Sequence, residues 1–287
     1  MLWMALAIVA AILWSIGSIF EKHIITYELR DIRLDTVITK TTIVALFIAV
    51  ALIFGTIGPF NVYLVLGGIV TAIGSYFLFY SLKKEEASRV IPLAMIGPLF
   101  VIILAFLFLN ETFTIIEYSA MLAIVAGSII ISLEKAKKKL IFAHALIFAV
   151  IAAILFAVRD VFFKFGVSDI FSSIFWFAIG ALLVHAIVFI WHHPHIIKKA
   201  RKGVRHLIII GFVNGVAFLL YLIAVSTGPV SIVSSLATLE AVFVFILATT
   251  LSFFHSKIIV EKLDRTDMII KISGILLIIA GVVGIVL

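Results

Sequence analysis

Ten long apolar runs, separated by short polar stretches, constrain this chain of 287 residues more than any other feature. Each run approaches the length of about 20 residues that an α-helix needs to cross a bilayer. A backbone inside a bilayer must satisfy its own hydrogen bonds, so unbroken apolar runs indicate helices rather than the alternating strands of a barrel. We expect helices at residues 2–20, 36–54, 62–82, 88–109, 115–133, 141–164, 170–191, 204–225, 229–254 and 267–287.

The composition excludes most soluble classes of protein. Apolar residues make up 64% of the chain and charged residues 13%, whereas soluble proteins hold roughly 45–50% and about 25%. We therefore expect an all-α, polytopic membrane protein whose surroundings are the lipid bilayer, with no nucleic-acid partner. No Walker A motif is present, so we expect no ATP hydrolysis. We also expect no cofactor and no metal, because the His-rich turn at residues 192–195 has neither acid nor cysteine support.

The basic residues divide the connections between helices into two groups. Nearly all Lys and Arg residues fall in or beside the odd-numbered connections, near residues 21–35, 83–89, 134–140, 192–203 and 255–266. The even-numbered connections hold none, although Arg159 and Lys164 lie near the sixth. The positive-inside rule therefore predicts a protein of the cell membrane with its odd-numbered loops in the cytoplasm and both termini outside.

The chain also repeats itself at an offset of about 142 residues. Matching positions include Trp14 with Phe156, Gly74 with Gly215, Tyr80 with Tyr221, Ser88 with Ser231 and, less closely, Glu111 with Glu261. Each copy holds five expected helices, and an odd number makes the second copy enter the membrane from the opposite side. We therefore expect one membrane domain of two inverted five-helix repeats, residues 1–134 and 135–287. Such repeats are typical of secondary transporters, whose site lies near the midplane between the repeats.

Several short motifs resemble those of one transporter family. The segment Trp14-Ser15-Ile16-Gly17 resembles a Trp-Gly turn in the family's first helix, and residues 87–93, Gly97-Pro98 and residues 107–111 resemble its fourth. Gly228-Pro229-Val230-Ser231 and residues 239–242 resemble the second copy of that pattern. In their order and doubling these motifs resemble the drug/metabolite transporter superfamily, in particular its ten-helix EamA-type exporters.

The chain departs from that pattern in several places. The family often has Glu-Pro in both copies, whereas this chain has Gly97-Pro98 without the acid and Glu240-Ala241 without the proline. Asn110 stands where the family usually has Gly before Glu111. The resemblance implies a transporter of small organic molecules. The family's substrates include amino acids, sugars, nucleotide precursors and drugs, so the resemblance leaves the substrate open.

The first and sixth expected helices hold the most informative candidate residues. Trp14 and Ser18 share one helix face, and their copies Phe156 and Asp160 share another, with Arg159 at its edge. An aromatic group followed by a polar group, in both copies, suggests the wall of a binding site. Arg159 can bind a carboxylate in bidentate fashion, and Asp160 can bind an amine or neutralise Arg159. The alternative is that these residues lie near a helix end and extend to water.

Five further residues complete the candidate substrate-binding set. Glu240 lies near the middle of the ninth expected helix, where an acid costs roughly 2.5–3.5 kcal/mol on insertion scales and is a functional candidate by default. Tyr76 and Tyr80 share a face of the third helix, and Asn214 and Tyr221 share a face of the eighth. Structural hydrogen bonding for Glu240, and positions at the membrane interface for the tyrosines, remain open alternatives.

We expect a secondary-active transporter that exports a small organic metabolite, such as an amino acid, by alternating access. A proton-coupled exporter of cationic drugs that uses Glu240 or Asp160 is the first alternative. A passive channel or an intramembrane enzyme is more distant, because the chain shows no pore ring and no catalytic constellation. Transport direction, a coupling proton or counter-substrate, and oligomeric state are not fixed by the sequence.

Overall fold

The computed structural model describes residues 1–24, 32–84, 90, 93–132, 144–192, 201–254 and 265–286, and these residues contain helices but no strand. Counting α10 and α11 as one interrupted span gives ten spans in the described part of the chain, which confirms the predicted fold class. The helices are α1 (Leu2–Ile24), α2 (Ile32–Phe54), α3 (Val62–Lys84), α5 (Gly97–Leu109), α6 (Ile115–Ser132), α7 (His144–Gly166), α8 (Ile170–His192), α9 (Arg201–Thr227), α10 (Val230–Ala237), α11 (Glu240–Phe254) and α12 (Arg265–Val286).

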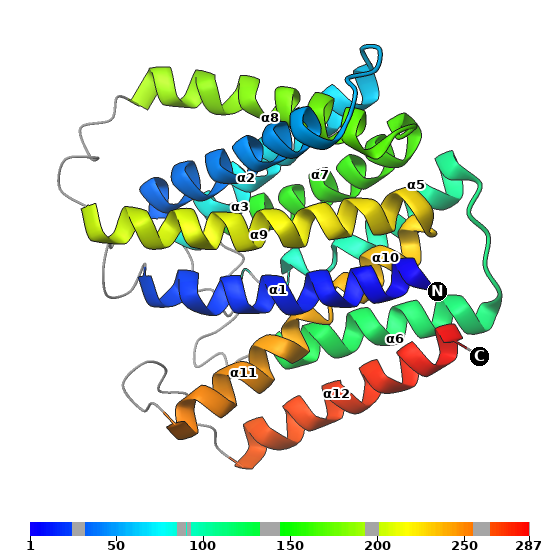
Figure 1. Ribbon diagram of the computed structural model, residues 1–287. Helices are drawn as coiled ribbons and strands as arrows, with labels where there is room; N and C mark the ends of the chain where they lie inside the picture. The colour runs from blue at the N-terminus through cyan, green and yellow to red at the C-terminus, as the bar shows by residue number, and fades with distance from the viewer. Residues whose placement is uncertain are drawn as a thin grey trace.

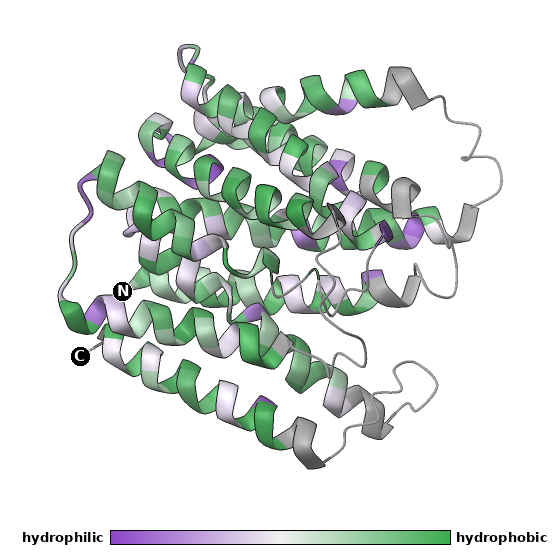
Figure 2. Cartoon of the chain, turned by 180° about the vertical axis from the view of Figure 1, so that it is seen from behind, coloured by the Kyte–Doolittle hydropathy of each residue, from purple (hydrophilic) through white to green (hydrophobic). Residues whose placement is uncertain are grey.

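The described helices have the length and apolar surface of membrane spans. Six spans, with α10 and α11 taken together as one, are long and apolar enough to cross a bilayer, and three shorter apolar helices accompany them. Figure 2 shows apolar residues along almost the whole length of the described helices. Large apolar side chains such as Leu107, Ile116 and Leu276 are more than half exposed, which suits an outer surface that faces lipid. The molecule is therefore a multi-pass membrane protein.

The helices pack in pairs that correspond under exchange of the two predicted repeats. Helix α1 packs against α9 and α2 against α9, while α7 packs against α3 and α8 against α3. In the same way α10 and α11 lie against α1, and α5 lies against α7. The predicted boundary between residues 134 and 135 itself falls outside the described residues.

These contacts divide eight of the spans into two bundles, each with helices from both predicted repeats. The first bundle contains α1, α2, α9 and the α10–α11 span, and the second contains α3, α5, α7 and α8. The remaining helices, α6 and α12, pack along each other at one side of the molecule (Figure 1). A Cβ atom built on Gly127 of α6 would lie only 2.5 Å from the Gly274 carbonyl oxygen of α12, so glycine allows this close approach.

Two spans are interrupted at corresponding residues. Helix α5 begins at Gly97, after a turn at Met95 and Ile96, and helix α11 begins at Glu240, after a turn at Thr238 and Leu239. Pro98, in the first turn of α5, has no amide hydrogen and therefore suits the start of a helix. The two breaks fall at Gly97-Pro98 and Glu240-Ala241, the places where the chain departs from the family's Glu-Pro pattern. Broken helices at matching positions of two repeats are typical of transporter binding sites.

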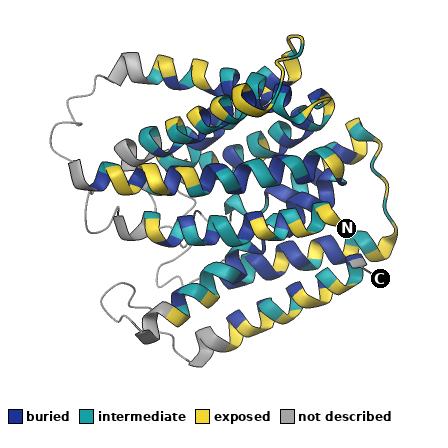
Figure 3. Cartoon of the chain, viewed as in Figure 1, coloured by how far each residue is buried: buried dark blue, intermediate teal, exposed yellow. Residues whose placement is uncertain are grey.

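Both termini lie at one end of the bundle, beside the connections at residues 55–61, 110–114, 167–169 and 228–229 (Figure 1). These four connections are the ones without Lys or Arg residues. We call this end the neutral end. Helix α10 begins there and runs into the centre of the bundle, where its residues 230–236 are all buried (Figure 3).

Candidate functional site

A buried ion pair on α7 forms the centre of the candidate site. The Arg159 Nε and Nη2 atoms each lie 2.8 Å from the Asp160 Oδ1 atom. The two side chains are 14% and 2% exposed, so the charges are almost fully enclosed by protein. A charge at this depth is costly unless it is paired, and adjacent positions on one helix provide that pairing locally. The local pairing also keeps the Arg159 side chain within the bundle, away from the nearby helix end.

Helix α9 supplies the second partner of this pair. The Tyr221 hydroxyl group donates a 2.7 Å hydrogen bond to the Asp160 Oδ2 atom, so both carboxylate oxygens of Asp160 are engaged. The Arg159 guanidinium carbon lies 5.2–5.5 Å from the ring centres of Phe156, Phe218 and Tyr221. Ring faces attract a cation, and the attraction grows when water is excluded.

The guanidinium group nevertheless keeps a free edge. Its Nε and Nη2 atoms lie within hydrogen-bond distance of Asp160, and the group also interacts with the Tyr221 side chain, whereas Nη1 has no hydrogen bond to Asp160. A planar guanidinium group with unused N–H donors can bind a carboxylate or phosphate group. Trp14 of α1 covers the same region, with its ring centre 5.3 Å from that of Tyr221. Trp14, Phe156, Arg159, Asp160 and Tyr221 are therefore brought together, and we call these five residues the central cluster.

A second contact joins α1 to the interrupted span one helical turn further along. The Ser18 hydroxyl group donates a 2.7 Å hydrogen bond to the Glu240 Oε1 atom. Glu240 is the first residue of α11, where the helix dipole favours a negative charge. Ser18 follows Trp14 by four residues on α1, so this contact lies about 6 Å along the helix from the central cluster. Among the described residues, the Glu240 Oε2 atom has no hydrogen-bond partner.

Asn214 lies between these two contacts on the face of α9 that packs against α1. A Cβ atom built on Gly17 would overlap the Asn214 Oδ1 atom, so glycine at this position makes room for the amide group. Asn214 is 8% exposed, and its Oδ1 atom has no hydrogen-bond partner in the described structure.

Tyr76 and Tyr80 are placed away from the central cluster. The Tyr76 hydroxyl group lies 3.0 Å from the Nδ1 atom of His185 on α8, which pairs two polar groups inside the bundle. Tyr80 is 46% exposed and packs edge-on against Phe148 of α7. Their role in binding stays a prediction, and no described contact joins either residue to the central cluster.

Hydroxyl side chains in and after α10 donate hydrogen bonds to backbone carbonyl oxygens of the same segment. The Ser235 hydroxyl group donates to the Ser231 carbonyl oxygen at 2.9 Å, and that of Thr238 donates to the Ser235 carbonyl oxygen at 2.7 Å. The Ser128 hydroxyl group of α6 reaches the Thr238 carbonyl oxygen at 3.1 Å, beside the break between α10 and α11. The hydroxyl groups therefore stabilise the interrupted span, as side chains commonly do where backbone leaves a membrane helix.

Phe218 packs against the central cluster, although sequence reasoning did not single it out. Its ring centre lies 5.5 Å from that of Phe47 and 6.3 Å from that of Tyr221. It follows Asn214 by four residues and precedes Tyr221 by three, so helical periodicity around those two candidates could have identified it. In the described part of the chain, no group of three His, Asp or Glu side chains is arranged to hold a metal ion.

Comparisons with known proteins agree with this architecture. A solved structure described only as the crystal structure of a protein superposes with a TM-score of 0.77, at 18% identity, over 99% of this chain and 96% of its own. At that identity the likeness concerns the fold alone. An uncharacterized protein of Methanocaldococcus jannaschii is 38% identical over 72 residues, which are 25% of this chain and 53% of that protein. The chain thus spans about half the length of this curated relative.

The family comparison covers the first predicted repeat. Residues 1–133 match the EamA-like transporter family, which is a branch of the drug/metabolite transporter superfamily. This confirms the resemblance expected from the motifs around Trp14, Gly97-Pro98 and Glu111. Residues 1–133 of the chain are thus similar to the EamA-like transporter family.

Proposed function

We propose that the protein is a secondary transporter that exports a small organic metabolite with a carboxylate group, such as an amino acid, by alternating access. The observation that carries the proposal is the free edge of Arg159 in the central cluster. A substrate carboxylate would bind that edge, and the rings of Trp14, Phe156 and Tyr221 would enclose the rest of the molecule. Because Asp160 is already engaged by Arg159 and Tyr221, the substrate amine would bind Glu240 instead.

The moving units that we propose are the two bundles rather than the two repeats. The central cluster draws Trp14 and Tyr221 from the first bundle and Phe156, Arg159 and Asp160 from the second. A substrate held between them would therefore contact both units. Relative rotation of the bundles would expose the cluster to one side of the membrane at a time, as alternating access requires.

A binding screen followed by a transport assay tests this proposal. A ligand at 100 times its dissociation constant should stabilise the purified protein by roughly 2.7 kcal/mol, which a thermal-shift measurement in detergent detects. We expect amino acids to stabilise the protein and to exchange across proteoliposome membranes. We expect Arg159→Lys to weaken substrate binding about tenfold or more, because lysine keeps the charge but loses the planar donor edge. The exposed Arg205 offers a matched control, Arg205→Lys, which should bind normally.

A proton-coupled exporter of cationic drugs is the second candidate, and the unpaired Oε2 atom of Glu240 favours it. In that case cations, rather than amino acids, would stabilise the protein, and Glu240→Gln would abolish their transport. Arg159→Lys would then leave cation binding unchanged. Full amino-acid binding and exchange in Arg159→Lys would contradict the leading proposal.

A further inference from the structure

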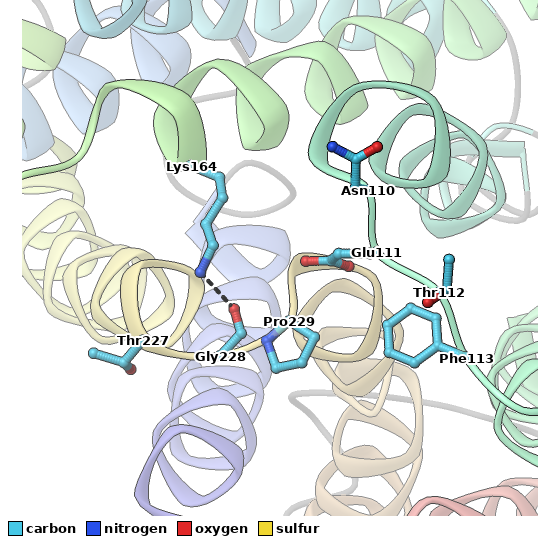
Figure 4. A pocket seen from close by; sticks show the side chains of 8 residues that line it. All are labelled: Asn110, Glu111, Thr112, Phe113, Lys164, Thr227, Gly228 and Pro229. Atoms are coloured by element: carbon cyan, nitrogen blue, oxygen red, sulfur yellow. Dashed lines mark hydrogen bonds between the residues drawn. The ribbon is translucent and has the colours of Figure 1, made fainter.

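Two charged side chains meet the connection between α9 and α10 at the neutral end of the molecule. Glu111 follows α5, and its carboxylate group accepts hydrogen bonds from the Val230 amide (2.7 Å), the Ser231 amide (3.1 Å) and the Ser231 hydroxyl group (2.8 Å). Lys164, near the end of α7, donates to the carbonyl oxygens of Val225 (2.9 Å), Ser226 (3.2 Å) and Gly228 (2.9 Å). Figure 4 shows the two side chains reaching this connection from different elements.

Each charge matches the helix end that it contacts. The first amides of a helix lack partners within the helix and carry partial positive charge, which the Glu111 carboxylate group neutralises at the start of α10. The last carbonyl groups of a helix carry partial negative charge, which the Lys164 ammonium group neutralises at the end of α9. One connection is thus held by two opposite charges.

Both charges come from the second bundle, and both helix ends belong to the first. Glu111 follows α5 and Lys164 lies on α7, whereas the connection they hold joins α9 to α10. These contacts therefore tie the two bundles together at the neutral end. Rotation of the bundles that opened this end would have to break them.

The same two helices link this end to the central cluster. Lys164 follows Asp160 by four residues on α7, so both lie on one helix face, and both bind α9. On α10, Ser231 binds Glu111, and Ser234, three residues further, interacts with the Tyr221 side chain. The contacts of Glu111 and Lys164 therefore lie at the neutral end, with Lys164 about one helical turn from Asp160 of the central cluster.

A cavity of about 470 Å³ adjoins these contacts, and its lining includes Glu111, Lys164, Thr112, Thr227 and Pro229. Its polar lining and its place at the end of the bundle make it accessible to water. When the contacts break, the carboxylate and ammonium groups can be hydrated there instead of being left unpaired in an apolar interior. Exchange of such hydrogen bonds with water changes the free energy only modestly, which suits a reversible closure.

From this geometry we propose that Glu111 and Lys164 form a clasp that closes the neutral end above the central cluster and opens in the other transport state. The proposal rests on alternating access, but its test requires no substrate. The chain contains no cysteine, so one introduced thiol gives a clean signal. Ser234→Cys places a thiol of similar size at a 6% exposed position beneath the clasp.

The test measures the rate at which a small, charged, membrane-impermeant methanethiosulfonate labels Ser234→Cys in the full-length protein. The reagent is added to the membrane face from which Ser168→Cys, on an exposed connection at the same end, is labelled. Loss of a charge-assisted contact should shift the closed–open equilibrium about tenfold or more. We therefore expect Glu111→Gln and Lys164→Met each to raise the labelling rate by about tenfold.

Thr112→Val supplies the matched control, because Thr112 lines the same cavity and makes no described hydrogen bond. Its labelling rate should equal that of the parent. If Glu111→Gln lowers the unfolding temperature but leaves the labelling rate of Ser234→Cys unchanged, Glu111 only caps α10 and does not control opening. That result would overturn the clasp. Faster labelling in a protein that transports none of the tested substrates would support the clasp while rejecting the proposed function.

Discussion

At the scale of single residues, the Arg159–Asp160 ion pair makes the stability of the protein sensitive to loss of either buried charge. Asp160 is 2% exposed and supplies the hydrogen-bonded counter-charge of a guanidinium group that is itself largely enclosed. Removing one partner of a buried pair leaves an uncompensated charge and costs about 3–5 kcal/mol. We expect Asp160→Asn to lower the unfolding temperature in detergent by an amount that corresponds to this loss.

A double variant separates the charge effect from a general packing defect. Combining Arg159→Met with Asp160→Asn removes both charges, so the double variant should unfold at a higher temperature than Asp160→Asn alone. It should not bind a carboxylate substrate. A double variant that is less stable than the single one would indicate that the interior depends on Arg159 for packing rather than on its charge balance.

At the scale of elements, the end of α5 sets the direction of the clasp. Asn110 has φ 54° and ψ 29°, which is the left-handed region, and its amide and that of Glu111 both donate to the Ala105 carbonyl oxygen. This turn closes α5 and directs the chain so that Glu111 reaches α10. Asparagine and glycine tolerate the left-handed conformation, whereas other residues pay about 1–2 kcal/mol.

The effect of a substitution at Asn110 should therefore depend on how well the new residue tolerates the left-handed conformation. We expect Asn110→Val to destabilise the protein by about 1–2 kcal/mol and to speed labelling of Ser234→Cys, because Glu111 would lose its position. Asn110→Gly, which restores the residue more usual in the family, should match the parent in both measurements. Equal stability of the valine and glycine variants, measured by thermal unfolding, would refute the role given to this turn.

The sequence predicted the helices and part of the candidate site, for a physical reason. Helix periodicity fixes which residues of one helix share a face, so Trp14 with Ser18 and Phe156 with Asp160 were predictable. The Ser18–Glu240 hydrogen bond was not predictable from periodicity, because it joins two different helices. Periodicity also treats residues 230–254 as one regular helix, whereas the break at Thr238 separates α10 from α11. The caps by Glu111 and Lys164 depend on the packing of α5 and α7 against other helices, which periodicity does not encode.

At the scale of the whole molecule, the arrangement of charge predicts how the protein lies in the membrane. The neutral end carries both termini and the connections without Lys or Arg residues, whereas the described helix ends that flank the basic stretches of the sequence lie at the opposite end. Basic residues near membrane helices are retained in the cytoplasm, so the neutral end should face outward. In that orientation the clasp closes the outer side, as the cytoplasm-facing state of an exporter requires.

Labelling of single cysteines in intact cells measures this orientation directly, because the parent protein has none. We expect an impermeant maleimide added outside the cells to label Ser168→Cys, which lies on an exposed connection at the neutral end. It should not label Lys138→Cys, in the basic stretch after α6, until the cells are made permeable. The reverse pattern would place the neutral end in the cytoplasm. The clasp would then close the cytoplasmic side of the membrane in this state.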